Sequence, residues 1–85
     1  MKEFEIIPYT KSDNSIPVKE FILSLSPKMQ AKILMEIDLL EEYGNELDIK
    51  YTKHLEDGIF ELRVKQSSNI TRILYFFYIG RRIIL

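Results

Sequence analysis

The sequence predicts an α+β fold, an α/β two-layer arrangement in which an N-terminal helical hairpin packs on one face of an antiparallel-rich sheet. Between residues 16 and 43, apolar residues repeat at intervals of three and four, which is the spacing of an amphipathic helix. From residue 59 onward, apolar and polar residues alternate, which is the spacing of a half-buried strand. The change of period near residue 55 therefore divides the chain into a helical part and a sheet-forming part.

A first strand is expected over residues 2–7, because Phe4 and Ile6 alternate with two glutamates. Pro8 ends this run, since proline has no N–H group to donate to a neighbouring strand. For the same reason, we expect the strand to lie near an edge of the sheet.

Two helices are expected next, and each begins with a capping residue that is followed by proline. The first covers residues 16–25, with Asn14 or Ser15 as its cap. The second is capped by Ser26 and is terminated by Gly44, a residue type that commonly ends helices. The apolar face of the second helix consists of Met29, Ile33, Ile37, Leu40 and Tyr43.

The rest of the chain is expected to form an antiparallel meander. Residues 45–53 have no strong periodicity and are interpreted as a loop, whereas residues 59–65 alternate. Residues 66–69 have the composition of a turn, and residues 70–78 are almost continuously apolar, as in a strand buried on both faces. A last strand is expected over residues 81–85. On the first strand of this hairpin, the apolar face consists of Phe60, Leu62 and Val64, and the charged face of Glu61, Arg63 and Lys65.

The register of the hairpin follows from the polar turn. If the turn is residues 66–69, Lys65 pairs with Ile70, so Arg63 lies opposite Arg72 on the same face of the sheet. Like charges directly opposite each other destabilise a sheet by roughly a few tenths of a kcal/mol. The arrangement is therefore expected to hold an anion between the two guanidinium groups. The alternative is that both are ordinary solvated strand residues.

Composition limits the class of protein. All 85 residues, 1–85, are expected to form a single domain, because a chain of this length buries only a modest core. With no Cys and a single His, no zinc or iron site is expected, and no cofactor. No segment resembles a membrane span or a secretory signal, so a cytoplasmic protein is expected.

The charges are unevenly distributed along the chain. Residues 1–57 contain seven Lys or Arg and twelve Asp or Glu, a net charge of −5, whereas residues 58–85 contain five and one, a net charge of +4. A basic sheet over an acidic scaffold is compatible with phosphodiester binding, although solvated acidic helices alone would give the same split. A solvated surface is expected for the acidic residues of the second helix, with partner binding as the alternative; they are Glu36, Asp38, Glu41 and Glu42.

One motif spans the predicted hairpin: leucine, glycine, an aromatic residue and Glu-Leu-Arg, followed after the turn by Arg-Ile-Leu-Tyr. Its residues are Leu55, Gly58, Phe60, Glu61, Leu62 and Arg63, then Arg72, Ile73, Leu74 and Tyr75. With the order of elements before it, this motif resembles the RelE/HigB superfamily of toxins from bacterial toxin–antitoxin pairs, specifically its phage-derived branch. The resemblance covers essentially the whole chain.

The resemblance implies a RelE-like fold, related to small microbial ribonucleases, and the role of toxin in a type II toxin–antitoxin system. Such toxins are ribosome-dependent, metal-independent mRNA endoribonucleases, also called mRNA interferases. The implied partners are a cognate antitoxin, expected to be a helix-turn-helix protein, and the ribosome with its mRNA.

The resemblance also implies roles for individual residues. Arg63 and Arg72 suit the charge on the phosphoryl oxygens, since guanidinium groups pair bidentately with phosphate. His54 belongs to the residue type best suited to proton transfer near neutral pH, and Glu61 is the other candidate, unless it only pairs with Arg63. The residues implied in RNA binding are Lys50, Lys53 and Lys65.

Members of this family generally continue past the last strand with a basic tail that holds further active-site residues. The sequence has no such tail after Leu85, so a weakly active or inactive form is expected. The alternative is a non-catalytic or truncated toxin-fold module that binds an antitoxin protein or RNA without cleaving it. A structural domain is a third class, favoured if carboxylates of the chain itself engage the two arginines.

Overall fold

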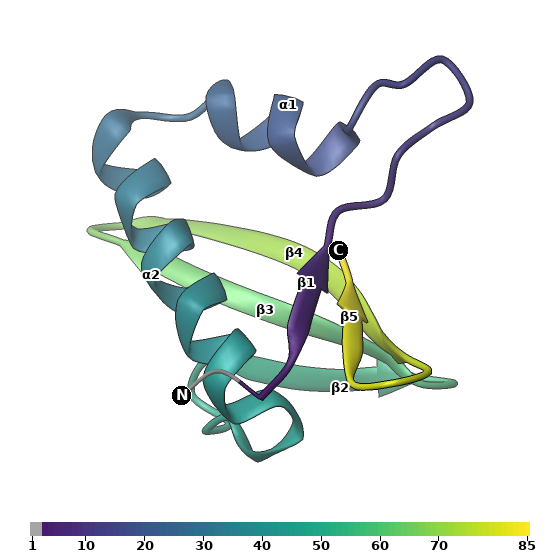
Figure 1. The fold of residues 1–85 in the computed structure, drawn as a ribbon. Helices are drawn as coiled ribbons and strands as arrows, with labels where there is room; N and C mark the ends of the chain where they lie inside the picture. Colours follow the sequence, from purple (N-terminus) through teal and green to yellow (C-terminus); the bar gives the residue numbers. More distant parts are fainter. Residues whose placement is uncertain (1–2) are drawn as a thin grey trace.

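The computed structural model describes residues 3–85 and has two helices packed against a five-stranded mixed sheet (Figure 1). The predicted α+β fold is therefore confirmed. The helices are α1 (Pro17–Leu23) and α2 (Pro27–Tyr43), followed by a short 3₁₀ helix, η1 (Gly44–Glu46). The strands are β1 (Glu5–Ile7), β2 (Thr52–Glu56), β3 (Ile59–Gln66), β4 (Asn69–Tyr78) and β5 (Arg82–Ile84).

The strands lie in the order β1-β5-β4-β3-β2. Strands β2 to β5 form an antiparallel meander, and β1 pairs with β5 in parallel, so the two ends of the described chain meet in the sheet. The predicted edge position of the first strand is confirmed. Its predicted start at Lys2 lies outside the described residues.

The two helices begin differently. At α2, the prediction is confirmed: Ser26 Oγ accepts a hydrogen bond of 3.2 Å from the backbone N–H of Met29. At α1, the predicted cap is wrong, because Ile16 occupies the cap position and contributes no side-chain hydrogen bond. Ser15 instead donates its N–H and its hydroxyl to Asp13 Oδ1, which lowers the pKa of that carboxyl. Helix α1 crosses near the N-terminal end of α2 (Figure 1).

Gly44 terminates α2, as predicted. Its φ of +52° lies in the left-handed region that favours glycine, and a Cβ atom at this position would collide with the ring of Phe4. The close approach has a structural purpose, because the N–H groups of Glu3 and Phe4 both donate to the carbonyl of Glu41 near the end of α2. Gly44 thus allows the segment before β1 to cross the end of the helix.

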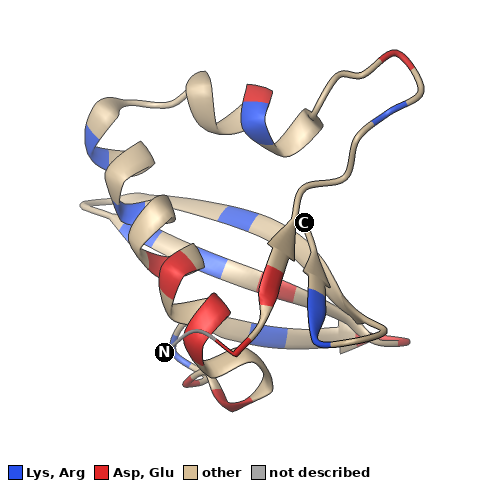
Figure 2. Cartoon of the chain, viewed as in Figure 1, with Lys and Arg blue, Asp and Glu red and all other residues tan. Residues whose placement is uncertain are grey.

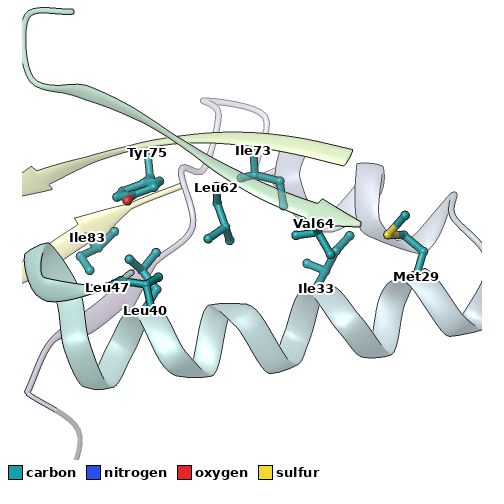
Figure 3. Close-up of a cluster of buried hydrophobic side chains, with 9 residues drawn as sticks. All are labelled: Met29, Ile33, Leu40, Leu47, Leu62, Val64, Ile73, Tyr75 and Ile83. Atoms are coloured by element: carbon teal, nitrogen blue, oxygen red, sulfur yellow. The ribbon is translucent and has the colours of Figure 1, made fainter. Parts of the chain in front are cut away.

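The core lies between α2 and the sheet (Figure 3). The predicted inward side of β3 is confirmed, since Leu62 and Val64 are fully buried. On α2, the fully buried stripe passes through position 36, whereas Ile37 is partly buried against the core and Tyr43 is 48% exposed. The buried apolar residues are Met29, Ile33, Leu40, Leu47, Leu62, Val64, Ile73, Tyr75 and Ile83.

Strand β2 was not predicted, because its residues were assigned in part to a loop. It forms the outer edge of the sheet beyond β3, and it is mostly exposed. An edge strand with little burial lacks the apolar alternation on which the prediction depends. The irregularity between His54 and Glu56 further disturbs its period of two.

Strand β4 is buried on one face only, which corrects the prediction of burial on both. Its residues alternate along the strand, with Thr71, Ile73 and Tyr75 buried and their neighbours exposed. The helices cover only one side of the sheet, so the apolar residues on the other side of β4 lie open to solvent (Figure 1). Among the described residues, no helix is long and apolar enough to cross a membrane.

Candidate functional site

The predicted register of the β3–β4 hairpin is confirmed. Lys65 pairs with Ile70, and Arg63 lies directly opposite Arg72. The pairing continues one step further than expected, to Gln66 and Asn69, so the turn contains only two residues. Because the pairing before the turn is unchanged, the two arginines begin from the same level of the sheet.

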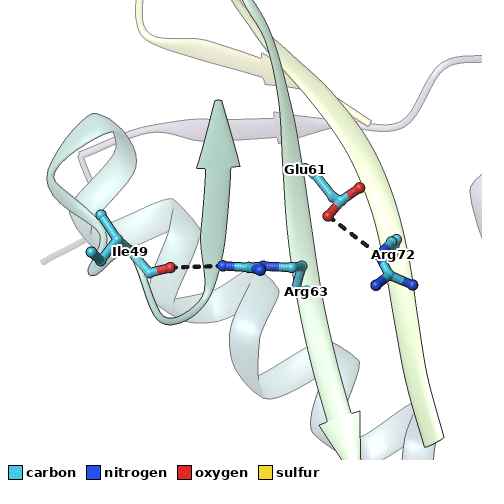
Figure 4. Close-up of polar contacts among 4 residues, drawn as sticks. All are labelled: Ile49, Glu61, Arg63 and Arg72. Atoms are coloured by element: carbon cyan, nitrogen blue, oxygen red, sulfur yellow. Dashed lines mark hydrogen bonds and ion pairs between the residues drawn. The ribbon is translucent and has the colours of Figure 1, made fainter. Parts of the chain in front are cut away.

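The two arginine side chains nevertheless diverge (Figure 4). Arg63 extends past the beginning of β2, where its Nη2 donates a hydrogen bond of 3.2 Å to the carbonyl of Ile49. Arg72 turns toward Glu61, and its Nε lies 3.4 Å from Glu61 Oε1. The two guanidinium groups therefore have different partners in the structure. Glu61 forms its ion pair with Arg72, whereas a pair with Arg63 was one of the two roles left open for it.

The point at which β2 begins explains the direction of the Arg63 side chain. The last register pair between β2 and β3 joins Thr52 to Leu62, and one further hydrogen bond of 2.7 Å runs from the N–H of Arg63 to the carbonyl of Tyr51. Beyond this point β3 has no neighbouring strand on that side. The side chains that follow can therefore extend around the edge of the sheet toward α2.

A pocket of ≈ 330 Å³ lies at this edge. Its size is near the lower end of the range of roughly 300–1,000 Å³ that is usual for small-molecule sites. Three elements form it: α2, the segment before β2, and the exposed part of β3. In Figure 2, the basic positions of α2 lie toward its N-terminal end, beside those of β3. The lining residues are Lys32 and Glu36 from α2, Lys50 and Tyr51 from the segment before β2, and Arg63 and Lys65 from β3. We call this the edge pocket.

The edge pocket is strongly basic. Four of its six lining residues are Lys or Arg, against one carboxylate, so it can attract an anionic group. Lys50 Nζ lies 5.1 Å from the centre of the Tyr51 ring, a cation–π arrangement that keeps this aromatic residue beside the basic groups. Guanidinium and ammonium groups beside an aromatic ring are the combination that binds phosphate and stacks on a base in single-stranded RNA.

Glu36 is the carboxylate of the edge pocket, and the expectation of a solvated surface is wrong for it. Only 2% of this residue is exposed, and burial raises the pKa of its carboxyl, while the nearby positive charge of Lys32 opposes the shift. Among the described residues, its Oε1 has no hydrogen-bond partner, and neither has the buried Nε of Arg63. The spacing of Glu36 after Ile33 and before Leu40 was the signal that could have predicted its burial.

The structure brings together three of the predicted site residues, Lys50, Arg63 and Lys65, and places the others elsewhere. Lys53 lies opposite Glu61 in the register of β2 and β3. Glu61 also contacts Arg72, on the side of the sheet that the helices leave uncovered. His54 pairs with Phe60, and their ring centres lie 4.8 Å apart. None of these four outlying residues, Lys53, His54, Glu61 and Arg72, lines the edge pocket.

The open face of the sheet carries apolar residues next to Arg72. Leu74 is 54% exposed, and Phe76 is 39% exposed. They help to form a shallow hollow of ≈ 280 Å³ with Tyr9, Ile59, Tyr75, Ile84 and Leu85. We call this surface the open face.

A further hollow, of ≈ 350 Å³, lies between α1, α2 and β1. Its lining is almost entirely apolar, with Lys19 and Gln30 as the polar exceptions. Within residues 3–85, no group of three or more His, Cys, Asp or Glu residues is placed to hold a metal ion.

The structure is a small α+β module with a basic pocket at the edge of a sheet that two helices cover. Comparison with known proteins specifies its class: residues 20–85 match the family described as phage-derived protein Gp49-like (DUF891). The chain belongs to this family, which is a family of RelE-like toxins. No curated protein and no solved structure matches the chain.

Proposed function

We propose that this protein is the toxin of a type II toxin–antitoxin system and that it cleaves mRNA on the ribosome without a metal ion. The observation that carries the proposal is the edge pocket, in which Arg63 lies with Lys32, Lys50 and Lys65 in a chain of a RelE-like toxin family. The proposed partners are the ribosome with its mRNA and a cognate antitoxin of helix-turn-helix type.

The chemistry requires the ribose 2′-hydroxyl to attack the adjacent phosphate in line, with negative charge developing on the phosphoryl oxygens. In the proposed mechanism, Arg63 pairs with these oxygens, and the lysines hold the flanking phosphates. Tyr51 provides a flat surface beside the bound strand, on which a base can stack. Arg63 is already partly ordered by its hydrogen bond to the Ile49 carbonyl, which lowers the entropy lost on binding.

The test is cleavage of mRNA by the purified protein on translating ribosomes, with the cut sites mapped by primer extension. The expected result is ribosome-dependent cleavage that persists in the presence of a metal chelator specific for transition metals and leaves a 2′,3′-cyclic phosphate. Arg82→Ala is a matched control, because Arg82 is an exposed arginine on β5 outside the edge pocket. Absence of cleavage by the unaltered protein would refute the proposed activity.

A second candidate function is favoured by the open face: a module that docks an antitoxin without cleaving RNA. Leu74 and Phe76 are exposed beside Arg72, so an acidic segment with an apolar side would complement this surface. The test is the affinity for the purified product of the neighbouring gene, with Leu74→Glu as the disrupting variant. Binding that Leu74→Glu weakens, in a protein that cleaves no mRNA, would support this function over the first.

A further inference from the structure

Glu36 occupies an unusual position for a carboxylate. It lies on the buried stripe of α2 between Ile33 and Leu40, and it lines the edge pocket together with Arg63. Its Oε1 and the Nε of Arg63 are both buried and have no hydrogen-bond partner among the described residues. An acceptor and a donor are therefore both unused in the walls of one pocket.

Burial of a carboxylate without a full set of hydrogen bonds lowers the stability of a folded protein. The packing of α2 does not require it, because an apolar residue at this position would complete the stripe formed by Met29, Ile33 and Leu40. A buried ionisable group in a pocket, with a perturbed pKa, is characteristic of a functional site. Burial raises the pKa of Glu36 above the ordinary value for a carboxyl.

We propose that Glu36 accepts the proton of the ribose 2′-hydroxyl when RNA is cleaved in the edge pocket, a role that rests on the cleavage activity proposed above. As the 2′ oxygen forms a bond to phosphorus, its proton passes to the Glu36 carboxylate. The bond between phosphorus and the 5′ oxygen breaks, and this oxygen takes a proton from water. The hydroxide that remains takes the proton from Glu36 and restores its carboxylate. The products are a 2′,3′-cyclic phosphate and a 5′-hydroxyl, with no change of oxidation state.

The geometry of the pocket gives Arg63 and Glu36 complementary roles. Arg63 stabilises the charge that develops on the phosphoryl oxygens, and its unused Nε is available as an additional donor. Glu36 lies across the pocket on α2, within a wall that otherwise supplies Lys32. The pocket opens to solvent at the sheet edge, so a flexible RNA strand can enter it.

The pH dependence of the reaction follows from the groups that face Glu36. These are Lys32 from α2, Lys50 and Tyr51 from the segment before β2, and Arg63 and Lys65 from β3. Lysine, arginine and tyrosine side chains ordinarily keep one charge state between about pH 5 and pH 8. Ionisation of Glu36 alone should therefore determine the acid side of the pH–rate profile.

The experiment is single-turnover cleavage of mRNA on programmed ribosomes between pH 5 and pH 8, by the unaltered protein and by Glu36→Gln. We expect the rate of the unaltered protein to rise with pH to a plateau. Glu36→Gln should be slower at the plateau by about 10²–10⁴-fold, the range of general acid–base catalysis, and should lose the acid limb. Glu36→Asp should keep the limb at a reduced rate, because it retains an ionisable carboxyl.

Two controls separate catalysis from structure. Glu20→Gln removes an exposed carboxylate of α1 outside the pocket and should leave the profile unchanged. Thermal unfolding of Glu36→Gln should show a cooperative transition at or above the temperature of the unaltered protein. Cleavage by Glu36→Gln within about threefold of the unaltered rate, with the same acid limb, would overturn the role of Glu36 alone. Absence of cleavage by the unaltered protein would instead refute the proposed activity itself.

Discussion

Arg63 and Arg72 are directly paired on β3 and β4, yet their surroundings differ in almost every respect. Arg63 reaches around the sheet edge into a basic pocket, and its buried Nε has no hydrogen-bond partner within residues 3–85. Arg72 remains on the open face, where its side chain is 56% exposed and contacts the carboxylate of Glu61. Two arginines that lie opposite each other in the register therefore make different contacts.

Strand register determines where a side chain leaves the backbone, but it does not determine which groups the end of that side chain contacts. Both arginines lie beyond the last register pair of an outer strand, since β2 pairs no further than Leu62 and β5 no further than Phe76. Arg63 turns toward the carbonyl of Ile49, and Arg72 turns toward the carboxylate of Glu61. A carboxylate of the chain itself engages Arg72, whereas the structural class of protein requires this of both arginines. Arg63 donates to a backbone carbonyl, that of Ile49.

The largest effect should come from truncating the two arginines separately. Arg63→Ala should reduce ribosome-dependent cleavage by about 10²–10³-fold, the usual loss when one donor to a developing oxyanion is removed. Arg72→Ala should reduce it by less than about tenfold, because Arg72 lies outside the edge pocket. Single-turnover rates on programmed ribosomes measure both. A larger loss in Arg72→Ala than in Arg63→Ala would move the site to the open face.

Sequence reasoning predicted the fold class, the hairpin register and the inward residues of β3, because each depends on local periodicity or turn chemistry. It missed β2, whose exposed residues carry no apolar alternation. It also missed the burial of Glu36 and the divergence of Arg63 from Arg72. Both depend on how α2 and the end of β2 are placed around β3, which is tertiary information that one strand pair does not contain.

The burial of Glu36 in the edge pocket should make the stability of the protein depend on pH. A raised pKa in the folded protein means that folding favours the protonated carboxyl, so this contribution to stability is complete below the ordinary pKa near 4.5 and is lost as pH rises through the raised value. Glu36→Gln should therefore stabilise the protein at pH 7, because the amide does not have to be ionised within the buried site. The gain should disappear on acidification.

Chemical denaturation of both proteins between pH 4 and pH 8 measures this difference in unfolding free energy. Glu20→Gln is again the matched control, since it changes an exposed carboxylate and should show little difference at any pH. A stability difference for Glu36→Gln that does not vary with pH would mean that the carboxyl is not perturbed by its burial.

A smaller effect should follow from single lysine substitutions. Lys50→Ala and Lys65→Ala each remove one ammonium group from the edge pocket, whereas Lys53→Ala removes one opposite Glu61 on the neighbouring face. Each pocket lysine that contacts a phosphate should contribute about 0.7 to the salt dependence of binding to single-stranded RNA. Fluorescence titration at several salt concentrations should show reduced slopes for the first two variants and an unchanged slope for Lys53→Ala.

The smallest effect concerns the ion pair that holds Arg72. Glu61 is largely buried, with 13% of its side chain exposed, but Arg72 is mostly solvated, so their interaction should contribute only about 0.2–1 kcal/mol to stability. A double-mutant cycle with Glu61→Gln and Arg72→Ala, measured by chemical denaturation, isolates this coupling, which should weaken as salt is added. If Arg72 is structural and Glu61 only pairs with it, Glu61→Gln should leave the cleavage rate and its pH profile unchanged. A Glu61→Gln protein that loses cleavage but keeps its stability would identify Glu61 as the proton acceptor in place of Glu36. A purely structural role of Glu61 would instead lower cleavage and stability together.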